Sequence, residues 1–235
     1  MKNIITIILT CAIGANTFVV SAQQVPFISK DSLSSQMKQI AKAESQTNWI
    51  KFKESAAIKA KTIFSDYKST FGLAENDEML NYKIETDDLG FTQNHYQQYY
   101  KNIKIDGESF TVHTNKSGIT YAANGNILTG IDLNIVPILT ASEAINFALK
   151  SINSQEYRWQ SDFWEKEIKE RTGKLDSTYF PVPELVIKEV KNAKYRQYFL
   201  AYRMDIYSSS PNNSQRIFID ANTGKMLETF PLQSN

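Results

Sequence analysis

Cysteine, histidine and glycine are scarce in this sequence of 235 residues, and each scarcity excludes a class of chemistry. Cys11 is the single cysteine, so no internal disulfide can form. A catalytic zinc normally takes three protein ligands from His, Cys, Asp or Glu. His95 and His113 are the only histidines, and no H-E-x-x-H sequence is present. We therefore expect no metal site in this protein.

Motifs for nucleophilic catalysis and for phosphate binding are also missing. No G-x-S-x-G sequence occurs, and no serine stands in a recognisable nucleophile context near either histidine. The nine glycines are spread singly through predicted turns, so none forms a phosphate-binding loop. Acidic pairs such as Asp87-Asp88 have the pattern of solvated turns. We expect no catalytic residue and no cofactor, and the chain itself is not expected to be an enzyme.

Neither sign of charge dominates the sequence. It contains 26 Lys and Arg residues against 25 Asp and Glu residues. Nucleic acids and anionic membrane surfaces attract proteins through a basic field, which a balanced sequence does not provide. We therefore expect no nucleic-acid partner and no membrane partner once the N-terminal segment has been removed.

Long hydrophobic runs are absent, and the one apolar stretch near the N-terminus is short. Lys2 precedes the apolar residues Ile4–Ile13, and Val20 and Ala22 place small residues at the −3 and −1 positions of a signal-peptidase site. This pattern predicts a secretory signal that is cleaved after Ala22. The processed protein is therefore expected to be secreted or periplasmic.

Two other readings of the N-terminus have less support. The apolar run is too short to span a bilayer as a permanent anchor. Cys11 is a candidate for lipid modification, but Thr10 before it is bulky for that processing.

The remaining sequence has enough apolar material for one or two cores, since 42% of all residues are hydrophobic and 12% are aromatic. Residues 23–50 are polar with weak apolar periodicity, which predicts an exposed, partly helical leader. Apolar residues then recur at helical spacing between Glu54 and Phe71, and Gly72 follows as a stop signal. This pattern predicts an amphipathic helix.

An antiparallel meander is predicted after this helix. Alternating residues and turn signals predict strands at 80–86, 95–105, 109–114 and 119–123. Asp106-Gly107, Asn115 to Gly118 and Asn124-Gly125 are the predicted turns, because Asp-Gly and Asn-Gly pairs supply the positive φ angles of tight hairpins.

A second module of the same kind begins at Thr140. Thr140 and Glu143 have the spacing of a capping box, followed by an apolar helical face up to Ile152. Residues 157–171 predict a further helix that stops at Gly173. Strands are then predicted at 185–190, 195–207, 216–220 and 225–230. The fold class is therefore expected to be α+β, with two small modules that each pack a helix on an antiparallel meander.

Residues 90–127 hold the side chains with the greatest chemical interest. His95 and His113 lie on different predicted strands, where they either face each other across the hairpin or are separate structural residues. Tyr96, Tyr99, Tyr100 and Phe110 form either a binding face with the neighbouring amides or the packed side of a strand under a helix.

The run from Gly90 to Gly125 contains the core G-x4-H-Y-Q-Q-x-Y-x-N-I-x-I-D-G. It resembles the fungalysin/thermolysin-type propeptide (FTP) domain that precedes secreted zinc metallopeptidases. The second module, with Tyr202–Ile206 and Phe218–Leu227, resembles the PepSY domain that follows it in the same prosegments. The resemblance implies cystatin-like and PepSY-like versions of the α+β fold.

The resemblance also implies a division of the chain and a set of motif residues. The implied segments are a signal peptide (1–22), a polar leader (23–50), an FTP-like propeptide domain (51–131), a linker (132–139) and a PepSY-like domain (140–235). The implied motif residues, structural or in contact with the protease, are Gly90, His95, Tyr96, Gln97, Gln98, Tyr99, Gly107, Gly118, Asp220 and Gly224.

The role implied by the resemblance is that of a prosegment. Such a segment inhibits its zinc metallopeptidase before activation and assists its folding, and the partner is the catalytic domain, in cis or in trans. In the family that domain, with its H-E-x-x-H, follows the prosegment directly, and the sequence leaves open whether it follows Asn235 here. Residues 228–235 are a strand or tail that could extend toward the catalytic cleft, and the sequence leaves open whether they occupy it. The alternative is a stand-alone exported inhibitor or binding module that acts in trans.

Overall fold

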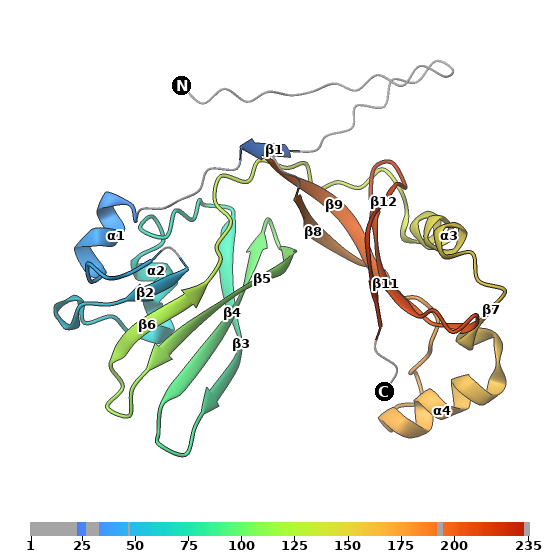
Figure 1. The fold of residues 1–235 in the computed structure, drawn as a ribbon, viewed down its shortest axis with the longest axis horizontal. Coiled ribbons are helices and arrows are strands. Elements are labelled where there is room, and N and C mark those ends of the chain that lie inside the picture. The colour runs from blue at the N-terminus through green and yellow to red at the C-terminus, as the bar shows by residue number, and fades with distance from the viewer. Residues whose placement is uncertain (1–22, 27–32, 47, 192–194, 233–235) are drawn as a thin grey trace. The chain divides into compact units, whose positions relative to one another are not determined.

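The computed structural model describes residues 23–26, 33–46, 48–191 and 195–232. The chain divides into two units, one of residues 26–132 and one of residues 133–235 together with the residues up to Val25 (Figure 1). The predicted signal peptide and its cleavage residue, Ala22, lie outside the described residues.

The unit of residues 26–132 is built on a five-stranded antiparallel sheet. Its strand order is β2-β6-β5-β4-β3. The strands are β2 (Trp49–Lys51), β3 (Asp77–Thr86), β4 (Thr92–Tyr100), β5 (Ile103–Thr114) and β6 (Thr120–Gly125). The helical segments are α1 (Ser35–Ile40), η1 (Glu54–Ala56), η2 (Ala60–Thr62) and α2 (Ile63–Asp66).

The core of this unit lies between one face of the sheet and the helical segments. Phe64 of α2 is its centre, because its ring lies edge-on to those of Tyr96 and Phe110, at 4.9 and 5.6 Å between centroids. Phe71 packs against Phe64 and Phe110 in the same cluster. Such edge-to-face aromatic contacts add to the stabilisation from burial.

The segment predicted as an exposed leader contributes to this core, so that prediction is wrong from Leu33 onward. Met37, Ile40 and Ile50 are buried in the cluster. β2 pairs with β6, which places Ile50 opposite Ala123. The few apolar residues of a polar segment suffice here because Met37, Ile40 and Ile50 all point into the core.

The predicted helix of residues 54–71 is also wrong as a continuous element. It is divided into η1, η2 and α2, and Ala57 lies at φ +47° between the first two. β-branched residues are poor helix formers, and burial of Ile58 and Ile63 in the core favours the broken path. The apolar spacing therefore predicted the buried face and not the local conformation.

The predicted strand of residues 95–105 is wrong, because the backbone reverses direction within it. β4 ends at Tyr100, and Lys101 and Asn102 form the turn to β5 with φ angles of 48° and 65°. Positive φ at both central residues suits the right-handed twist of a hairpin. The predictions of turns at Gly107 and Gly125 are also wrong, since these residues lie within β5 and β6.

The second unit contains a four-stranded antiparallel sheet in the order β12-β11-β9-β8, with β1 also paired to β9. The strands are β1 (Gln23–Pro26), β8 (Glu184–Lys191), β9 (Tyr195–Ile206), β11 (Gln215–Asp220) and β12 (Met226–Pro231). A separate pair is formed by β7 (Glu156–Tyr157) and β10 (Ser208–Ser210). The helices are α3 (Ala141–Ile152), η3 (Arg158–Gln160) and α4 (Asp162–Thr172).

The helix predicted after Thr140 is confirmed, and the helix predicted at residues 157–171 is confirmed from Asp162 onward, since residues 157–160 belong to β7 and η3. Thr140 and Glu143 form the capping box at the start of α3, and Gly173 ends α4 in the left-handed conformation. α3 packs on β9, β11 and β12, with Ala144 and Ala148 fully buried (Figure 1). Small residues at these positions allow the helix to lie close to the sheet. The α+β fold class is thus confirmed.

Gly224, in the turn between β11 and β12, lies close to the side chain of Phe147 in α3. A Cβ atom there would lie 2.6 Å from three ring carbons of Phe147 in α3, and the backbone has φ +73°. We predict that Gly224→Ala lowers the free energy of unfolding by about 2–4 kcal/mol, from left-handed strain and steric overlap together. Urea denaturation measures this loss.

Gly173→Ala is the matched control. Gly173 has φ +68° and no heavy atom within 4 Å of the added Cβ. It should therefore cost only the backbone strain, about 1 kcal/mol. Equal losses in the two variants would show that the Phe147 contact has no effect.

Candidate functional site

β4 holds five of the ten predicted motif residues, on both faces of the sheet. Tyr96 and Gln98 point to the buried face. His95, Gln97 and Tyr99 alternate with them and lie half-buried on the opposite face. This is the period-two arrangement of a strand, so neighbouring motif residues have different surroundings.

Tyr96 fastens the helical segments to the sheet. Its hydroxyl donates to the Ala60 carbonyl at 2.7 Å, and its ring contacts Phe64. Burial raises the pKa of the Tyr96 phenol, although a hydrogen bond with Asn81 opposes the shift. Tyr96 is therefore a neutral hydrogen-bond donor in the core.

Gln98 hydrogen-bonds the backbone segment that follows β6. Its side chain is 1% exposed, its Nε2 donates to the Leu128 carbonyl at 2.7 Å, and its Oε1 accepts from the Leu128 N–H at 2.9 Å. The same side chain interacts with Asp77 at the start of β3 and lowers the pKa of that carboxyl, although burial, the largest effect, raises it. One amide thus joins β4 to both ends of the meander.

Gln97 has the same chemistry on the other face. Its Nε2 lies 2.7 Å from the Ile105 carbonyl and 3.0 Å from the Glu108 carbonyl. These carbonyls belong to an irregularity in β5, where the register with β4 shifts and Gly107 has φ +84°. Gln97 therefore donates hydrogen bonds to backbone carbonyls that the irregularity takes out of the regular pairing between β4 and β5.

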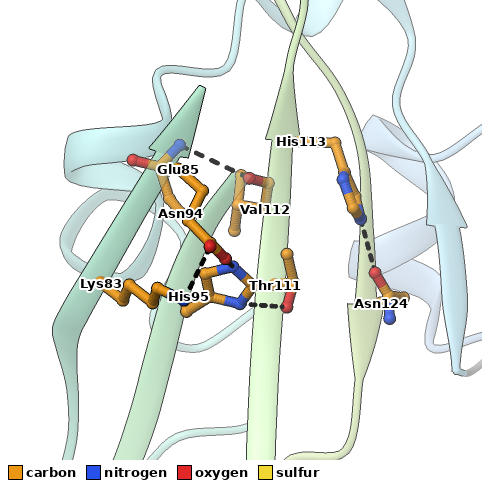
Figure 2. Close-up of polar contacts among 8 residues, drawn as sticks. All are labelled: Lys83, Glu85, Asn94, His95, Thr111, Val112, His113 and Asn124. Carbon is orange, nitrogen blue, oxygen red and sulfur yellow. Dashed lines mark hydrogen bonds and ion pairs between the residues drawn. The ribbon is translucent and has the colours of Figure 1, made fainter. Parts of the chain in front are cut away.

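The two histidines do not face each other, as Figure 2 shows. His95 lies between Glu85 of β3, at 2.9 Å, and Thr111 of β5, at 3.1 Å. His113 contacts Asn124 of β6 at 2.5 Å. Each imidazole joins neighbouring strands, so the alternative of two separate structural histidines is the correct one.

Three of the predicted motif glycines end turns that an Asp or Asn oxygen closes. Asp87 accepts from the N–H groups of Leu89 and Phe91 before β4, in the turn that contains Gly90. Asn115 accepts from Ser117 and Ile119 around Gly118, and Asp220 accepts from Asn222 and Thr223 before Gly224. The glycines have φ angles from 73° to 82°, which glycine adopts at little cost.

Of the two alternatives for the cluster of Tyr96, Tyr99, Tyr100 and Phe110, the packed side of a strand is the correct one for three members. Tyr96, Tyr100 and Phe110 are 5%, 3% and 2% exposed, so they belong to the packed side of the sheet. Tyr99 alone lies on the half-buried face, opposite Lys104 of β5.

A different set of aromatic residues is exposed, and the sequence reasoning missed it. Trp49, Phe91 and Tyr121 are 42%, 36% and 41% exposed. Trp49 and Tyr121 lie 5.5 and 6.1 Å from the ring of His113, and Phe91 lies 6.2 Å from Tyr121. We call these four residues the aromatic face. Each of these residues is one outward-facing residue on or next to a different strand. Only the register of the strands brings the four residues together, and the sequence alone does not give that register.

The second unit has a shallow cleft of about 240 Å³ beside β8, β9 and β11. Two cross-strand ion pairs line it, Arg216 with Asp205 at 2.7 Å and Arg203 with Glu184. Because each guanidinium already has a carboxylate partner, the cleft has balanced charge and is a poorer candidate site than the aromatic face.

Within the part of the protein that the structure describes, the His, Asp and Glu residues form no group of three or more that could hold a metal ion. None of the helices in this part is long and apolar enough to cross a membrane. The geometry of β4 instead supports hydrogen bonding that holds the sheet together.

We predict that Gln98→Leu lowers the free energy of unfolding by about 2–4 kcal/mol, because it leaves the buried N–H and C=O of Leu128 without partners. Gln97→Leu, one residue away, should cost less than half as much, since Gln97 is half-buried and water can reach its surroundings. Urea denaturation of both variants tests this ranking, and a reversed order would contradict the assigned roles.

The contacts of Glu85 predict a pH dependence. A hydrogen bond from Lys83 is the largest effect on the pKa of Glu85. Desolvation, the second-largest effect, raises this pKa, but the charge of Lys83 and the contacts with His95 add to the hydrogen bond, and the pKa lies below its ordinary value of 4.5. A carboxyl whose pKa is lower in the folded state than in the unfolded state stabilises the fold at pH values above its unfolded-state pKa. This stabilisation is lost as the pH falls through the folded-state pKa. The stability difference between wild type and Glu85→Gln should therefore be full at neutral pH and disappear on acidification below 4.5. A difference that is constant with pH would contradict this.

One comparison with known protein families covers the part of the chain that contains these residues. Residues 77–127 match the Fungalysin/Thermolysin Propeptide Motif. No curated protein matches this sequence. Among solved structures, the C-terminal domain of YpeB from Bacillus megaterium is similar, with 12% sequence identity over 91% of this chain and 90% of that chain and a TM-score of 0.35. That similarity is too weak to support an argument about function.

The matched segment begins with β3 and ends one residue before the backbone that Gln98 holds. Residues 77–127, and with them β3 to β6, therefore carry the fungalysin/thermolysin propeptide motif.

Proposed function

We propose that this protein is the prosegment of a secreted zinc metallopeptidase of the thermolysin type. Residues 51–131 are its FTP-like domain, and residues 140–235 are its PepSY-like domain. The observation that carries the proposal is the match of residues 77–127 to the propeptide motif. A signal peptide that is removed after Ala22 accounts for export, to a secreted or periplasmic location.

The proposed mechanism is occlusion, which requires no catalytic residue. The side chains of Tyr96, Gln97 and Gln98 are all engaged in internal hydrogen bonds. They make the sheet rigid, and a rigid surface binds a partner with a smaller loss of conformational entropy than a flexible one. An interface of standard size is sufficient to cover a catalytic cleft.

We assign the contact with the protease to the aromatic face. Its members are the aromatic residues Trp49, Phe91 and Tyr121 and the imidazole of His113, and none of them is acidic or a lysine or arginine. Interface cores are enriched in tyrosine, tryptophan and phenylalanine and depleted of charged residues. Such residues also supply most of the binding energy when they fill pockets on the partner.

The C-terminal segment has a smaller part in this mechanism than the sequence suggested. Glu228 to Pro231 belong to β12 and pair with residues 215–218 of β11. They are therefore part of the sheet of the second unit. Inhibition through these residues would first require that the pairing be broken.

The folding role follows from the same binding. A surface that fits only the native catalytic domain stabilises that state by mass action. The catalytic domain is the proposed partner, in cis within a longer polypeptide or in trans as a separate protein. Both arrangements use the same surface.

Purified residues 23–235, added to a thermolysin-like protease, should slow the hydrolysis of a peptide substrate in a dose-dependent way. Trp49→Ala and Tyr121→Ala should each weaken the inhibition at least about tenfold, because truncation of a residue that anchors an interface costs about 2 kcal/mol or more. Inhibition constants measure the effect, and thermal unfolding confirms that the variants fold.

Leu175→Ala is the control, because Leu175 is 91% exposed but lies in the other unit. The Leu175→Ala variant should inhibit the protease with the same inhibition constant as the wild type. No inhibition by the wild type at large molar excess, over several such proteases, would contradict the proposed function. Inhibition that survives both aromatic substitutions would contradict the assigned surface only.

A further inference from the structure

Leu175 is the most exposed large apolar residue in the part of the chain that the structure describes. It is 91% exposed and lies in the segment of residues 173–183, which joins α4 to β8 (Figure 1). All residues from Arg171 to Asp176 are exposed as well. Solvent therefore reaches the whole stretch around this side chain.

The backbone at Leu175 is held only weakly. Within the described residues, its N–H and C=O groups have no hydrogen-bond partner. The turn around it is closed by a backbone hydrogen bond from Ser177 to Lys174, at 3.3 Å, and by a hydroxyl hydrogen bond from Thr172 to Ser177, at 2.7 Å. α4, which precedes the turn, has no buried residue. Segments with few buried contacts open locally at a small cost in free energy.

Two other residues are nearly as exposed, but their backbones are constrained. Leu89 is 74% exposed, and its N–H donates to the Asp87 carboxylate, which closes the turn. Val182 is 75% exposed and lies between Pro181 and Pro183, whose rings fix the backbone.

The remaining exposed apolar residues of the described chain are held by secondary structure or by a backbone hydrogen bond. Those in helices or strands are Trp49, Leu80, Tyr82, Ile84, Tyr121, Phe147, Phe163, Met226 and Phe230. Those whose N–H group donates to another residue are Phe91, Ile119, Val136, Ile138 and Phe180. Within the described residues, Leu175 alone combines high exposure with a weakly held backbone.

We propose that Leu175 is a cleavage site for endoproteases that bind a large apolar side chain. Such enzymes take an extended segment and place the recognised side chain in an apolar pocket. Exposed loop tips are the preferred positions of such cuts in folded proteins.

The bond that is cut depends on which side of it the enzyme recognises. An enzyme that recognises the residue before the bond cuts between Leu175 and Asp176. Water attacks the carbonyl carbon of Leu175, a C–O bond forms there, and the C–N bond to Asp176 breaks. The nitrogen of Asp176 takes a proton and becomes an amine, and Leu175 keeps the new carboxylate, so water is the only co-reactant.

Hydrogen bonds across the site hold the two products together. Tyr179 follows the site and is 3% exposed. Its N–H donates to Glu165 of α4 at 2.8 Å, and its hydroxyl donates to Glu167 at 2.8 Å and accepts from Arg171 at 3.2 Å. A cut at Leu175 therefore opens the loop and leaves α4 attached.

The test is limited digestion of the folded full chain with chymotrypsin, whose specificity pocket is a hydrophobic slot. Mass spectrometry of the products should show a cut after Leu175. Leu175→Ala should slow this cut at least about tenfold, because most of the side chain that fills the pocket is removed. Leu175→Phe should accelerate it. Size-exclusion chromatography of the cut protein should give one species that contains both fragments.

Leu89→Phe is the matched control, because it places an aromatic side chain at a well-exposed position in a turn that Asp87 closes. It should create no comparable cut. Absence of the cut from both the wild type and Leu175→Phe would overturn the proposal. A cut in Leu89→Phe as fast as that in Leu175→Phe would also overturn it, and fragments that separate would contradict the attachment through Tyr179.

The digestion is independent of the inhibition assay. Chymotrypsin uses a serine nucleophile and no zinc, so the proposed inhibition of zinc metallopeptidases does not protect the chain from it. Leu175 also lies in the other unit from the aromatic face. Failure of the cut would leave the proposed function standing, and failure of the inhibition would leave the cleavage site standing.

Discussion

The hydrogen bonds from the buried Gln98 amide to Leu128 are the interaction on which the propeptide-like unit depends. They attach the segment that follows β6 to β4, and the same amide interacts with Asp77 at the beginning of β3. A buried amide is costly unless its donor and acceptor are both satisfied. This arrangement therefore favours one register of the meander over its alternatives.

The same strand explains why a motif rich in reactive side chains has no reactive centre. Each of the four residues His95 to Gln98 hydrogen-bonds a group outside β4. Their side chains alternate between the two faces of the sheet. Once these groups are engaged internally, the exposed chemistry of the unit is that of the aromatic face. Recognition by surface is the function that such an arrangement supports, and the propeptide motif agrees with it.

Sequence reasoning predicted the elements whose signals are local. The Thr140 capping box gave α3, and alternation gave the strands of the second unit within one or two residues. It failed where tertiary contacts decide the conformation, as at Ala57, which breaks the predicted helix, and at Lys101, an unusual residue for a positive-φ turn. The aromatic face could not be predicted, because Trp49 and Tyr121 meet only through the pairing of β2, β6 and β5.

The central claim is that the β4 motif acts through the fold and not through contact with the protease. The most direct test is the inhibition constant of Gln98→Leu, measured at a temperature low enough for the variant to be fully folded, as checked by circular dichroism. The account predicts the wild-type value under these conditions, because the Gln98 side chain is 1% exposed and cannot reach a partner. A tenfold or greater loss of inhibition by the folded variant would contradict it.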